Sequence, residues 1–419
     1  MMISDAVRDL LLECSHSIAD AIKVAGVEEA EAVAEELGRL VSGAVVQQLL
    51  KSVKSGSYQG SGIDCDCVSR ARFMGYRKRT VVTSSGPADV ERAYYHCRGC
   101  GTGQIPWDEA QGLNERQMTP RMKALVSELS AVLPYGQATR MVERLTGVTV
   151  QQSTAERMVA EVGSRVREAD DRRAEAALAG ELAAEASPER LIVQTDGTCS
   201  HIDDDWHEVK SAVVVDGKGI RRRRTAARER SDVFGERIYA LAVEAGVEQA
   251  EEVVAIGDGA QWINTQFAHH FPDAIRVLDI WHAREHIWEV ARAHYGEDTE
   301  QGKRWARRHC RRLKEEGPEP LLRALGALKP KTQEAAEVIR RERAYFRSRR
   351  EQMQYPQFAA RDIPLGSGQV EAACKVVVGQ RLKCAGMRWS HDGADAVLAL
   401  RCLVLDEQHQ LIRKYARAA

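Results

Sequence analysis

The chain has 419 residues, of which 44% are hydrophobic and 29% charged, and its formal net charge is −1 at pH 7. This length exceeds one compact core and indicates two to four folding units. No run approaches 18 consecutive apolar residues, which excludes an ordinary membrane-spanning helix, and ten cysteines in so long a chain are no disulfide framework.

The near-zero net charge hides an uneven distribution. Residues 27 to 37 and 167 to 189 are acidic, whereas 221 to 230, 303 to 314 and 340 to 350 are strongly basic. A polyanionic partner is therefore not excluded. The first residues form an amphipathic helix pattern without a signal-peptide core, so we expect a cytoplasmic protein that does not enter a membrane.

Residues 1 to 62 are predicted to be a helical region. Apolar residues recur at spacings of three and four in two stretches, which are Leu10, Leu11, Ile18 and Ile22, and then Ala34, Leu37, Leu40, Val41, Val45 and Leu49. Glycine and serine from 55 to 62 indicate a linker.

Residues 63 to 108 are predicted to be a zinc-ribbon-like hairpin, with strands at 79 to 83 and 90 to 96 around a turn at 84 to 89. Cysteines lie at both of its ends, and four sulfurs could form a closed tetrahedral zinc site. The candidate ligands are Cys65, Cys67, Cys97 and Cys100. The alternative is reduced thiols without metal, because Asp64 stands where the first cysteine of a regular Cys-x-x-Cys pair would fall. Cys199 is not expected to be a ligand.

Residues 109 to 190 are predicted to be helical. A helix from Tyr135, a turn near Gly147 and a second helix from Ser153 suggest a helix-turn-helix that binds DNA, although an ordinary helix pair has the same pattern. The Ala/Glu-rich tract up to Pro188 is interpreted as a helical spacer.

Residues 191 to 282 and 361 to 405 are predicted to form one α/β catalytic domain with an RNase H-like mixed sheet. Three successive strands are followed by alternating helices and strands, the order of such a sheet. The expected elements are strands at 191 to 196, 206 to 215 and 220 to 228, a helix at 234 to 245, a strand at 253 to 257, a helix at 260 to 269 and a strand at 275 to 279. Residues 283 to 360 would be an all-α insertion, and 406 to 419 a C-terminal tail.

Three acidic residues lie where an apolar strand or a glycine turn would present them. Asp196 and Asp258 follow apolar runs, and Glu371 follows the turn at 366 to 368. Carboxylates at the ends of buried strands need a cation, a donor or water, and three that converge suit hard divalent metals. Our hypothesis is phosphoryl transfer on nucleic acid with two Mg²⁺ or Mn²⁺ ions roughly 3.5 to 4 Å apart.

Each of these acids also has a structural interpretation. Asp-Gly is a common turn pair, and Glu371 could be a helix-surface acid favoured by the helix dipole. A capping box from Ser367 would need its acid at position 370, which is Val370, so it does not explain Glu371. Asp279 and His282 end the next strand, either as a buried structural pair or as groups bordering the metal site.

Seven basic residues and no acid occupy 303 to 314, where they would repel one another without a counter-charge. We therefore expect DNA-backbone contacts, with Tyr345 and Phe346 of the next basic run as base-stacking groups. The candidate DNA-binding residues are Lys303, Arg304, Arg307, Arg308, Arg311, Arg312, Lys375, Arg381 and Lys383. Lys375 could equally pair with Glu371. Trp281, Trp288 and Trp305 are assigned to the core of the insertion.

Six short motifs occur in order along the chain: Gly75-Tyr-Arg with Tyr94-Tyr-His-Cys97, Thr195-Asp-Gly-Thr198, Gly257-Asp-Gly-Ala260, Asp279-Ile-Trp-His-Ala283, Tyr355-Pro-Gln-Phe358, and Gly366-Ser-Gly-Gln-Val-Glu-Ala-Ala-Cys-Lys375 through Met387-Arg-Trp389. On these motifs, the chain from 63 to 405 resembles bacterial insertion-sequence transposases of the DDE type in the Kra group, and distantly Mutator-like element transposases.

The resemblance implies that Asp196, Asp258 and Glu371 are the DDE triad and that Asp279 and His282 form the Asp-x-x-His signature. It implies metal-dependent cleavage at element ends, followed by attack of the 3′-hydroxyl on target DNA. The implied partners are double-stranded terminal repeats and target DNA, held by a dimer or a larger synaptic complex at the nucleoid. The alternatives are an RNase H-like nuclease without strand transfer and a domesticated DNA-binding protein.

Overall fold

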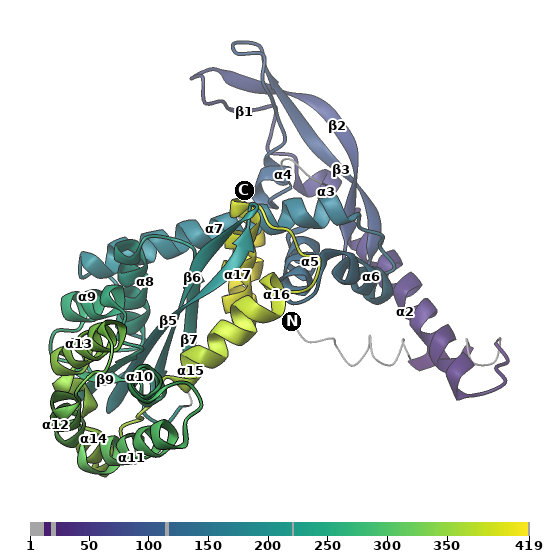
Figure 1. Cartoon of the computed structure of the whole chain (residues 1–419). Helices are drawn as coiled ribbons and strands as arrows, with labels where there is room; N and C mark the ends of the chain where they lie inside the picture. The colour runs from purple at the N-terminus through teal and green to yellow at the C-terminus, as the bar shows by residue number, and fades with distance from the viewer. Residues whose placement is uncertain (1–11, 18–21, 114–116, 220–221, 418–419) are drawn as a thin grey trace. The chain divides into compact units, whose positions relative to one another are not determined.

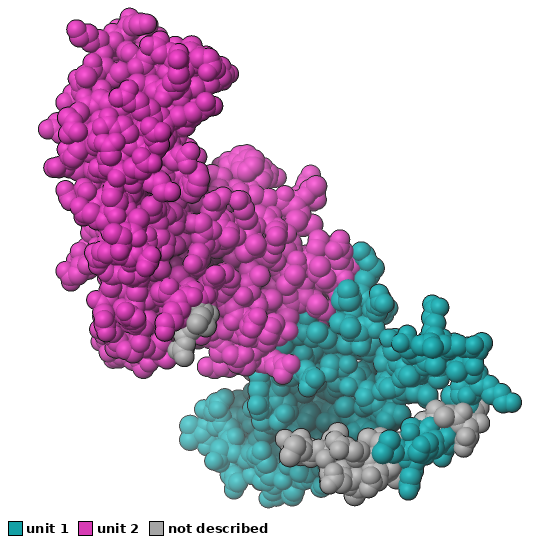
Figure 2. Space-filling view, turned by 90° about the horizontal axis from the view of Figure 1, so that it is seen from below, with its two compact units in different colours: residues 1–125, 140–150, 417–419 teal, residues 126–139, 151–416 magenta. Residues whose placement is uncertain are grey.

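The computed structural model describes residues 12–17, 22–113, 117–219 and 222–417. The chain divides into two compact units (Figure 2). Unit 1 comprises Met1–Leu125, Arg140–Val150 and Arg417–Ala419, and unit 2 comprises Val126–Thr139 and Gln151–Ala416. Each unit therefore gathers segments that are separated in the sequence.

Unit 1 is built on a four-stranded antiparallel sheet in the order β1-β2-β3-β4 (Figure 1). The strands are β1 (Gly62–Asp64), β2 (Arg70–Thr83), β3 (Gly86–Cys97) and β4 (Gly103–Gln104). Helices α2 (Val27–Leu50) and α3 (Val53–Gly56) precede the sheet, and α4 (Pro106–Ala110) follows it. The predicted hairpin is present.

The predicted turn of this hairpin, at 84 to 89, was too long. Thr83 pairs with Gly86, so the connection is two residues, and Gly86 takes a positive φ of 104°. Pro87 lies within β3 at a point where β4 does not reach, since β4 pairs only with Tyr95 and His96. A proline is tolerated at such an edge because no neighbouring strand needs its missing N–H.

The second predicted N-terminal helix is confirmed as α2, whereas most of the first lies outside the described residues. The apolar residues that predicted α2 include Leu40 and Leu49, and both are exposed. The helix pair around Gly147 is also present, as α6 (Tyr135–Thr146) and α7 (Gln152–Leu178), after α5 (Pro120–Val132). The predicted spacer is not helical up to Pro188, because α7 ends at Leu178 before Gly180 with φ 72°.

Unit 2 contains a mixed five-stranded sheet in the order β7-β6-β5-β8-β9. Strands β5 (Arg190–Ile202), β6 (Asp205–Asp216) and β7 (Arg222–Ala227) are antiparallel, whereas β8 (Glu252–Gly257) and β9 (Ile275–Leu278) run parallel to β5. Every predicted strand is present. Strand β5 continues past Asp196, where the Asp-Gly pair had suggested an end.

Helices cover both faces of this sheet, so β5 is buried on both sides. Successive residues of β5 contact helices on opposite faces. Leu191 and Val193 pack with α8 (Ser231–Glu244) and α9 (Gln261–His270), whereas Ile192 packs with the helical block that follows β9. That block is α10 (Ile280–Tyr295), α11 (Glu300–Glu316), α12 (Glu319–Ala327), α13 (Gln333–Ser348), η1 (Arg350–Met353) and α14 (Tyr355–Ala360).

The predicted all-α insertion is present, and it shares a continuous apolar core with the sheet. Trp288 and Trp305 pack against this core as predicted. Trp281 does not, because its side chain at the start of α10 is 60% exposed. The assignment of Trp281 to the insertion core was wrong.

The last part of unit 2 is helical: α15 (Gly368–Ala373), the π-helix η2 (Cys374–Gly379), α16 (Gln380–Leu382), α17 (His391–Leu405) and α18 (His409–Arg417). The predicted C-terminal tail is thus an ordered helix that buries Ile412 and Ala416. Within the described ranges, no helix has the length and apolar character needed to cross a membrane.

Candidate metal-binding and nucleic-acid-binding sites

Asp196 and Asp258 lie on neighbouring parallel strands. Gln194 pairs with Ile256, so two residues further on, Asp196 of β5 is level with Asp258, which directly follows β8. Their Oδ1 atoms accept hydrogen bonds of 2.7 Å from the backbone N–H groups of Gly197 and Ala260. Burial, together with the charges of Asp258 and Asp279, raises the pKa of Asp196. Anionic groups gathered in this way favour a cation between them.

Asp279 follows β9 and caps α10. Its Oδ1 accepts from the N–H groups of Trp281 and His282, and its Oδ2 accepts from both the N–H and the hydroxyl of Ser367 at 2.5 Å. Burial disfavours the charged Asp279 carboxylate, but the nearby His282 ring and hydrogen bonds from Ser367 and Trp281 outweigh it and lower its pKa. Asp279 therefore joins α10 to the turn before α15, which fits the structural interpretation.

His282 lies beside these carboxylates on α10. Its Nδ1 is 3.8 Å from Asp279 Oδ1, and its side chain is 37% exposed. The Asp279 carboxylate, opposed by burial and assisted by Asp258, raises the pKa of His282 to about 9. An imidazolium here can neutralise part of the negative charge or contact a phosphate.

We predict a specific pH dependence for this imidazolium. Because the pKa of His282 is raised from 6.5 to about 9 in the folded protein, its stabilising effect is full below pH 6.5 and is lost as pH rises through about 9. NMR titration of the metal-free protein should give an apparent pKa near 9, and His282→Gln should lower the melting temperature at pH 6 but not at pH 10. Titration near 6.5 would contradict the pairing with Asp279.

Glu371 does not converge with the two aspartates. Its side chain is 60% exposed and forms a 2.7 Å ion pair with Lys375 on the next turn. The helix itself does reach β5, because Val370 N donates to Gln194 Oε1 and Cys374 Sγ lies 3.9 Å from Asp196 Oδ2. The element that carries Glu371 is thus beside Asp196, with the carboxylate directed toward Lys375.

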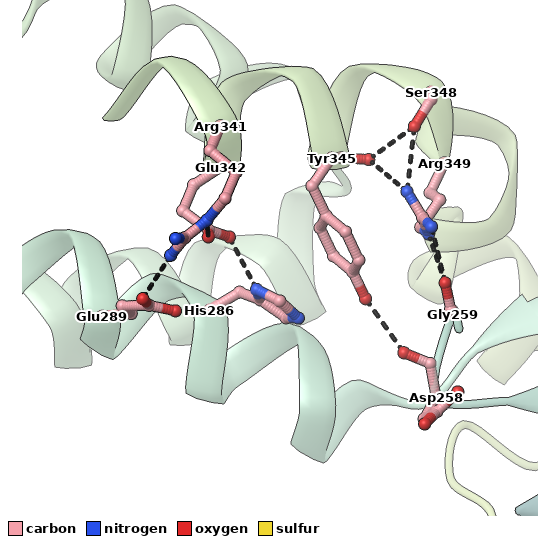
Figure 3. Close-up of polar contacts among 9 residues, drawn as sticks. All are labelled: Asp258, Gly259, His286, Glu289, Arg341, Glu342, Tyr345, Ser348 and Arg349. Atoms are coloured by element: carbon pink, nitrogen blue, oxygen red, sulfur yellow. Dashed lines mark hydrogen bonds and ion pairs between the residues drawn. The ribbon is translucent and has the colours of Figure 1, made fainter. Parts of the chain in front are cut away.

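Across the described residues, two groups bring three or more ligand atoms within 4.8 Å of one another, and the predicted triad is not one of them. One group is His286, Glu289 and Glu342, which no spacing in the sequence indicates because its members lie on two helices, α10 and α13. Arg341 already bonds both of these glutamates, and His286 Nδ1 lies 2.6 Å from Glu342 Oε2 (Figure 3). This group is a hydrogen-bonded ion network between two helices.

The other group is the predicted set of four cysteines in unit 1. The sulfur of Cys65 is 3.6 Å from that of Cys100 and 3.7 Å from that of Cys67, which is 3.5 Å from that of Cys97. Tetrahedral zinc with Zn–S bonds of ~2.3 Å requires sulfur separations of ~3.8 Å. The four sulfurs therefore fit a closed structural zinc site, despite the irregular first pair.

The irregular pair is accommodated by the backbone after Cys67. Val68 takes a positive φ of 71°, and its N–H donates to the carbonyl of Cys65 at 2.9 Å. The second pair has the corresponding turn, in which Gly101, with φ 74°, donates to Cys97. Both turns direct their sulfurs to one point.

We predict that the purified protein contains one zinc ion per chain and that Cys97→Ser removes it, because a closed site requires all four thiolates. Elemental analysis measures the zinc content directly. Cys199→Ser is the matched control, since Cys199 is exposed on β5 and lies outside the cluster. Equal zinc content in both variants would show that the cluster is not the zinc site.

The basic run on α11 is present as one exposed face of a helix whose opposite face, including Ala306 and Leu313, is buried. The expectation of missing counter-charges was wrong. Acids just outside the run form ion pairs with Lys303, Arg311 and Arg312. In the part of the chain that the structure describes, Arg307 and Arg308 have no acidic partner. Exposed ion pairs contribute about 0 to 1 kcal/mol, so phosphates could replace these acids.

The other candidate DNA-binding residues separate into two kinds. Lys375 and Lys383 are exposed, and Lys383 Nζ donates to Thr198 Oγ1 at 2.7 Å. Arg381 is only 1% exposed and donates to the carbonyl of Ser130 at 3.1 Å. Its guanidinium lies 4.6 Å from the Trp389 ring centre, so it is a core residue, and its assignment to DNA binding was wrong.

The predicted base-stacking groups are also not available at the surface. Phe346 is fully buried in the core that joins the insertion to the sheet. Tyr345 is partly buried and donates its hydroxyl to the backbone carbonyl of Asp258 (Figure 3). Trp281, two residues after Asp279, is by contrast 60% exposed, and its backbone N–H donates to Asp279 Oδ1.

These features define a two-unit protein in which a mixed α/β domain presents clustered acids and a small β unit carries a candidate zinc site. A model for the family described as "Uncharacterised protein family (UPF0236)" matches residues 68–414. The chain belongs to this family. A search of curated proteins found no match.

Proposed function

We propose that the chain is a metal-dependent DNA transposase of the DDE type whose catalytic domain is RNase H-like. The observation that carries the proposal is the pairing of β5 with β8, which sets Asp196 level with Asp258 and lets the charge of one raise the pKa of the other. The strand order β7-β6-β5-β8-β9, with three antiparallel strands followed by two parallel ones, supports the RNase H-like assignment.

In this proposal Asp196 and Asp258 hold divalent ions, Mg²⁺ or Mn²⁺. The like charges of these acids and the raised pKa of Asp196 fit hard cations. Bound ions would supply activation of the attacking oxygen and stabilisation of the leaving oxygen. Glu371 would complete the ligand set after leaving Lys375, and protonated His282 would contact the scissile phosphate.

The proposed substrate is double-stranded DNA, held in part by the exposed basic face of α11. A transposase joins two element ends to a target, so we propose a dimer or a larger synaptic complex. The cysteine cluster of unit 1 would serve as a structural zinc site.

We predict that Arg307→Ala with Arg308→Ala weakens duplex binding and makes it less salt-dependent. Each lost phosphate contact should reduce the slope of log K against log salt concentration by about 0.9. Fluorescence anisotropy with a labelled duplex at several salt concentrations measures both effects. Glu315→Gln with Glu316→Gln is the matched control: removing the competing acids should strengthen binding. Unchanged slopes in both variants would remove α11 from the interface.

The test of the function itself is incubation of a labelled duplex carrying the element's own flanking ends with protein and Mg²⁺ or Mn²⁺. Cleavage at the boundary followed by joined target products is the expected result. Cleavage without joining would identify a nuclease, and metal-independent binding alone would identify a DNA-binding protein; either outcome rejects the transposase assignment.

A further inference from the structure

We propose that Tyr345, on helix α13 of the insertion, and Arg349, directly after this helix, are positioning residues that hold the turn carrying Asp258. The inference rests on the proposed function for the role of Asp258, but the contacts themselves do not. In this proposal the helical insertion holds part of the acidic site in position.

Two side chains at the C-terminal end of α13, of which Arg349 is the C-cap residue, bind two consecutive carbonyl groups of this turn (Figure 3). Tyr345 Oη donates to the carbonyl of Asp258 at 3.0 Å. Arg349 donates to the carbonyl of Gly259 through Nε at 3.2 Å and through Nη2 at 2.5 Å. Since the carbonyls of adjacent residues are fixed, both peptide planes that flank Gly259 are fixed with them.

The orientation of these planes determines where the carboxylate points. Asp258 Oδ1 accepts a 2.7 Å hydrogen bond from Ala260 N, which closes the turn over Gly259. Gly259 takes a φ of 85°, which few residues other than glycine adopt. A Cβ at this position would lie 2.6 Å from Tyr345 Oη and 2.8 Å from Arg349 Nε, so α13 packs directly onto the turn.

Tyr345 is itself held from both faces of its ring. The His286 ring is stacked on it with centroids 3.9 Å apart and an interplanar angle of 24°, and the Arg349 guanidinium lies 4.0 Å from the ring centre. His286 is fixed in turn by Glu342, whose side chain is 2% exposed. The ion network of α10 and α13 therefore orients the hydroxyl that reaches Asp258.

The same contacts argue against a direct role of Tyr345 in chemistry. Its hydroxyl donates to a main-chain carbonyl. Because burial raises the pKa of Tyr345, the phenol remains protonated and a donor at ordinary pH. Tyr345 acts on the site through the backbone of Asp258, without touching the reacting atoms.

Tyr345→Phe tests the inference because it removes only the hydroxyl and keeps the stacked ring. Tyr355→Phe is the matched control. Tyr355 is buried in the same core and also donates to a main-chain carbonyl, that of Leu278 at 2.9 Å, outside the Asp258 turn. Both variants should lose a similar amount of thermal stability.

Two readouts separate local positioning from general stability. Amide hydrogen exchange of Ala260 in the metal-free protein should be roughly fivefold to tenfold faster in Tyr345→Phe and unchanged in Tyr355→Phe, as expected for loss of one local hydrogen bond. The affinity for Mn²⁺ alone, measured from the EPR signal of the free ion, should fall severalfold in Tyr345→Phe and stay unchanged in Tyr355→Phe. Arg349→Lys keeps the charge but loses the forked donor, so it should resemble Tyr345→Phe in both readouts.

Equal exchange rates in the two tyrosine variants would overturn the positioning role. Failure of the proposed function has a different signature. If wild type and Asp258→Asn bind Mn²⁺ equally weakly, Asp258 is not a metal ligand, while the exchange comparison still decides whether α13 holds its turn.

Discussion

Asp258→Asn is expected to lower metal-dependent DNA cleavage on the order of a thousandfold, the range seen when one preorganised electrostatic group is lost. The amide has the size of the carboxylate and keeps an oxygen that can accept from Ala260 N. The fold of the turn should therefore survive while the negative charge that would bind the metal disappears. Duplex binding should stay within about twofold, because α11 supplies the phosphate contacts in our proposal.

The same substitution has a spectroscopic consequence in the metal-free protein. The charge of Asp258 contributes to the raised pKa of Asp196, so its removal should lower that pKa. NMR titration of the Asp196 carboxyl carbon measures this shift. It reports the closeness of the two acids whether or not the protein cleaves DNA.

Asp273→Asn is the matched control for the cleavage experiment. Asp273 is exposed in the connection before β9, so this variant makes the same charge change in the same unit away from the site. Full activity of Asp273→Asn beside an inactive Asp258→Asn would identify a site effect. An active Asp258→Asn would show that the Asp258 carboxylate is not needed for cleavage. A variant that no longer binds DNA would show that Asp258 has a structural role.

The sheet of unit 2 could be predicted because each strand carries its own signal. The apolar runs ending at Asp196 and Asp258 are short and bounded by glycine, and the helices between them have the period of a buried face. The length of β5 could not be predicted, because Asp-Gly is compatible with a turn. Pairing with β6 over Asp205–Asp216 carries the strand through this pair to Ile202.

The candidate site was predictable only where local sequence determines the position of a side chain. Strand ends place Asp196 and Asp258, but the direction of Glu371 depends on its partner Lys375. Arg381 was misassigned because a charge in a sequence says nothing about burial between aromatic rings. The contact of Tyr345 with Asp258 spans 87 residues and no periodic pattern encodes it.

Unit 1 contains a buried ion pair, and we expect its disruption to lower the stability of this unit strongly. Arg92 Nε and Nη2 bind the two oxygens of Asp108 at 2.8 and 2.7 Å, and Arg92 Nη1 donates to the carbonyl of Arg77 at 2.6 Å. Arg92 and Asp108 are 3% and 4% exposed. This pair joins β3 to α4, so it fixes the helix against the sheet.

Arg92→Ala is expected to destabilise unit 1 by about 3 to 5 kcal/mol, because it leaves a buried carboxylate without its bidentate partner. Arg79→Ala is the matched control. Arg79 contacts the same Asp108 through one 2.8 Å ion pair, but its side chain is 18% exposed, so its loss should cost about 1 kcal/mol. Equal losses in the two variants would show that burial is not the reason for the strength of the pair.

The measurement must isolate unit 1, since the two units need not unfold together. Trp107 is the only tryptophan in the segments of unit 1, and it packs against Val81, Val90 and Leu113. Urea titration followed by the fluorine NMR signal of Trp107 in 5-fluorotryptophan-labelled protein therefore reports on this unit alone. Arg92→Met and Arg79→Met combined with Asp108→Leu should recover much of the lost stability, because three apolar side chains leave no buried charge at this position. Failure of this rescue would mean that the contact with the Arg77 carbonyl, which the triple variant also lacks, contributes more than the ion pairs themselves.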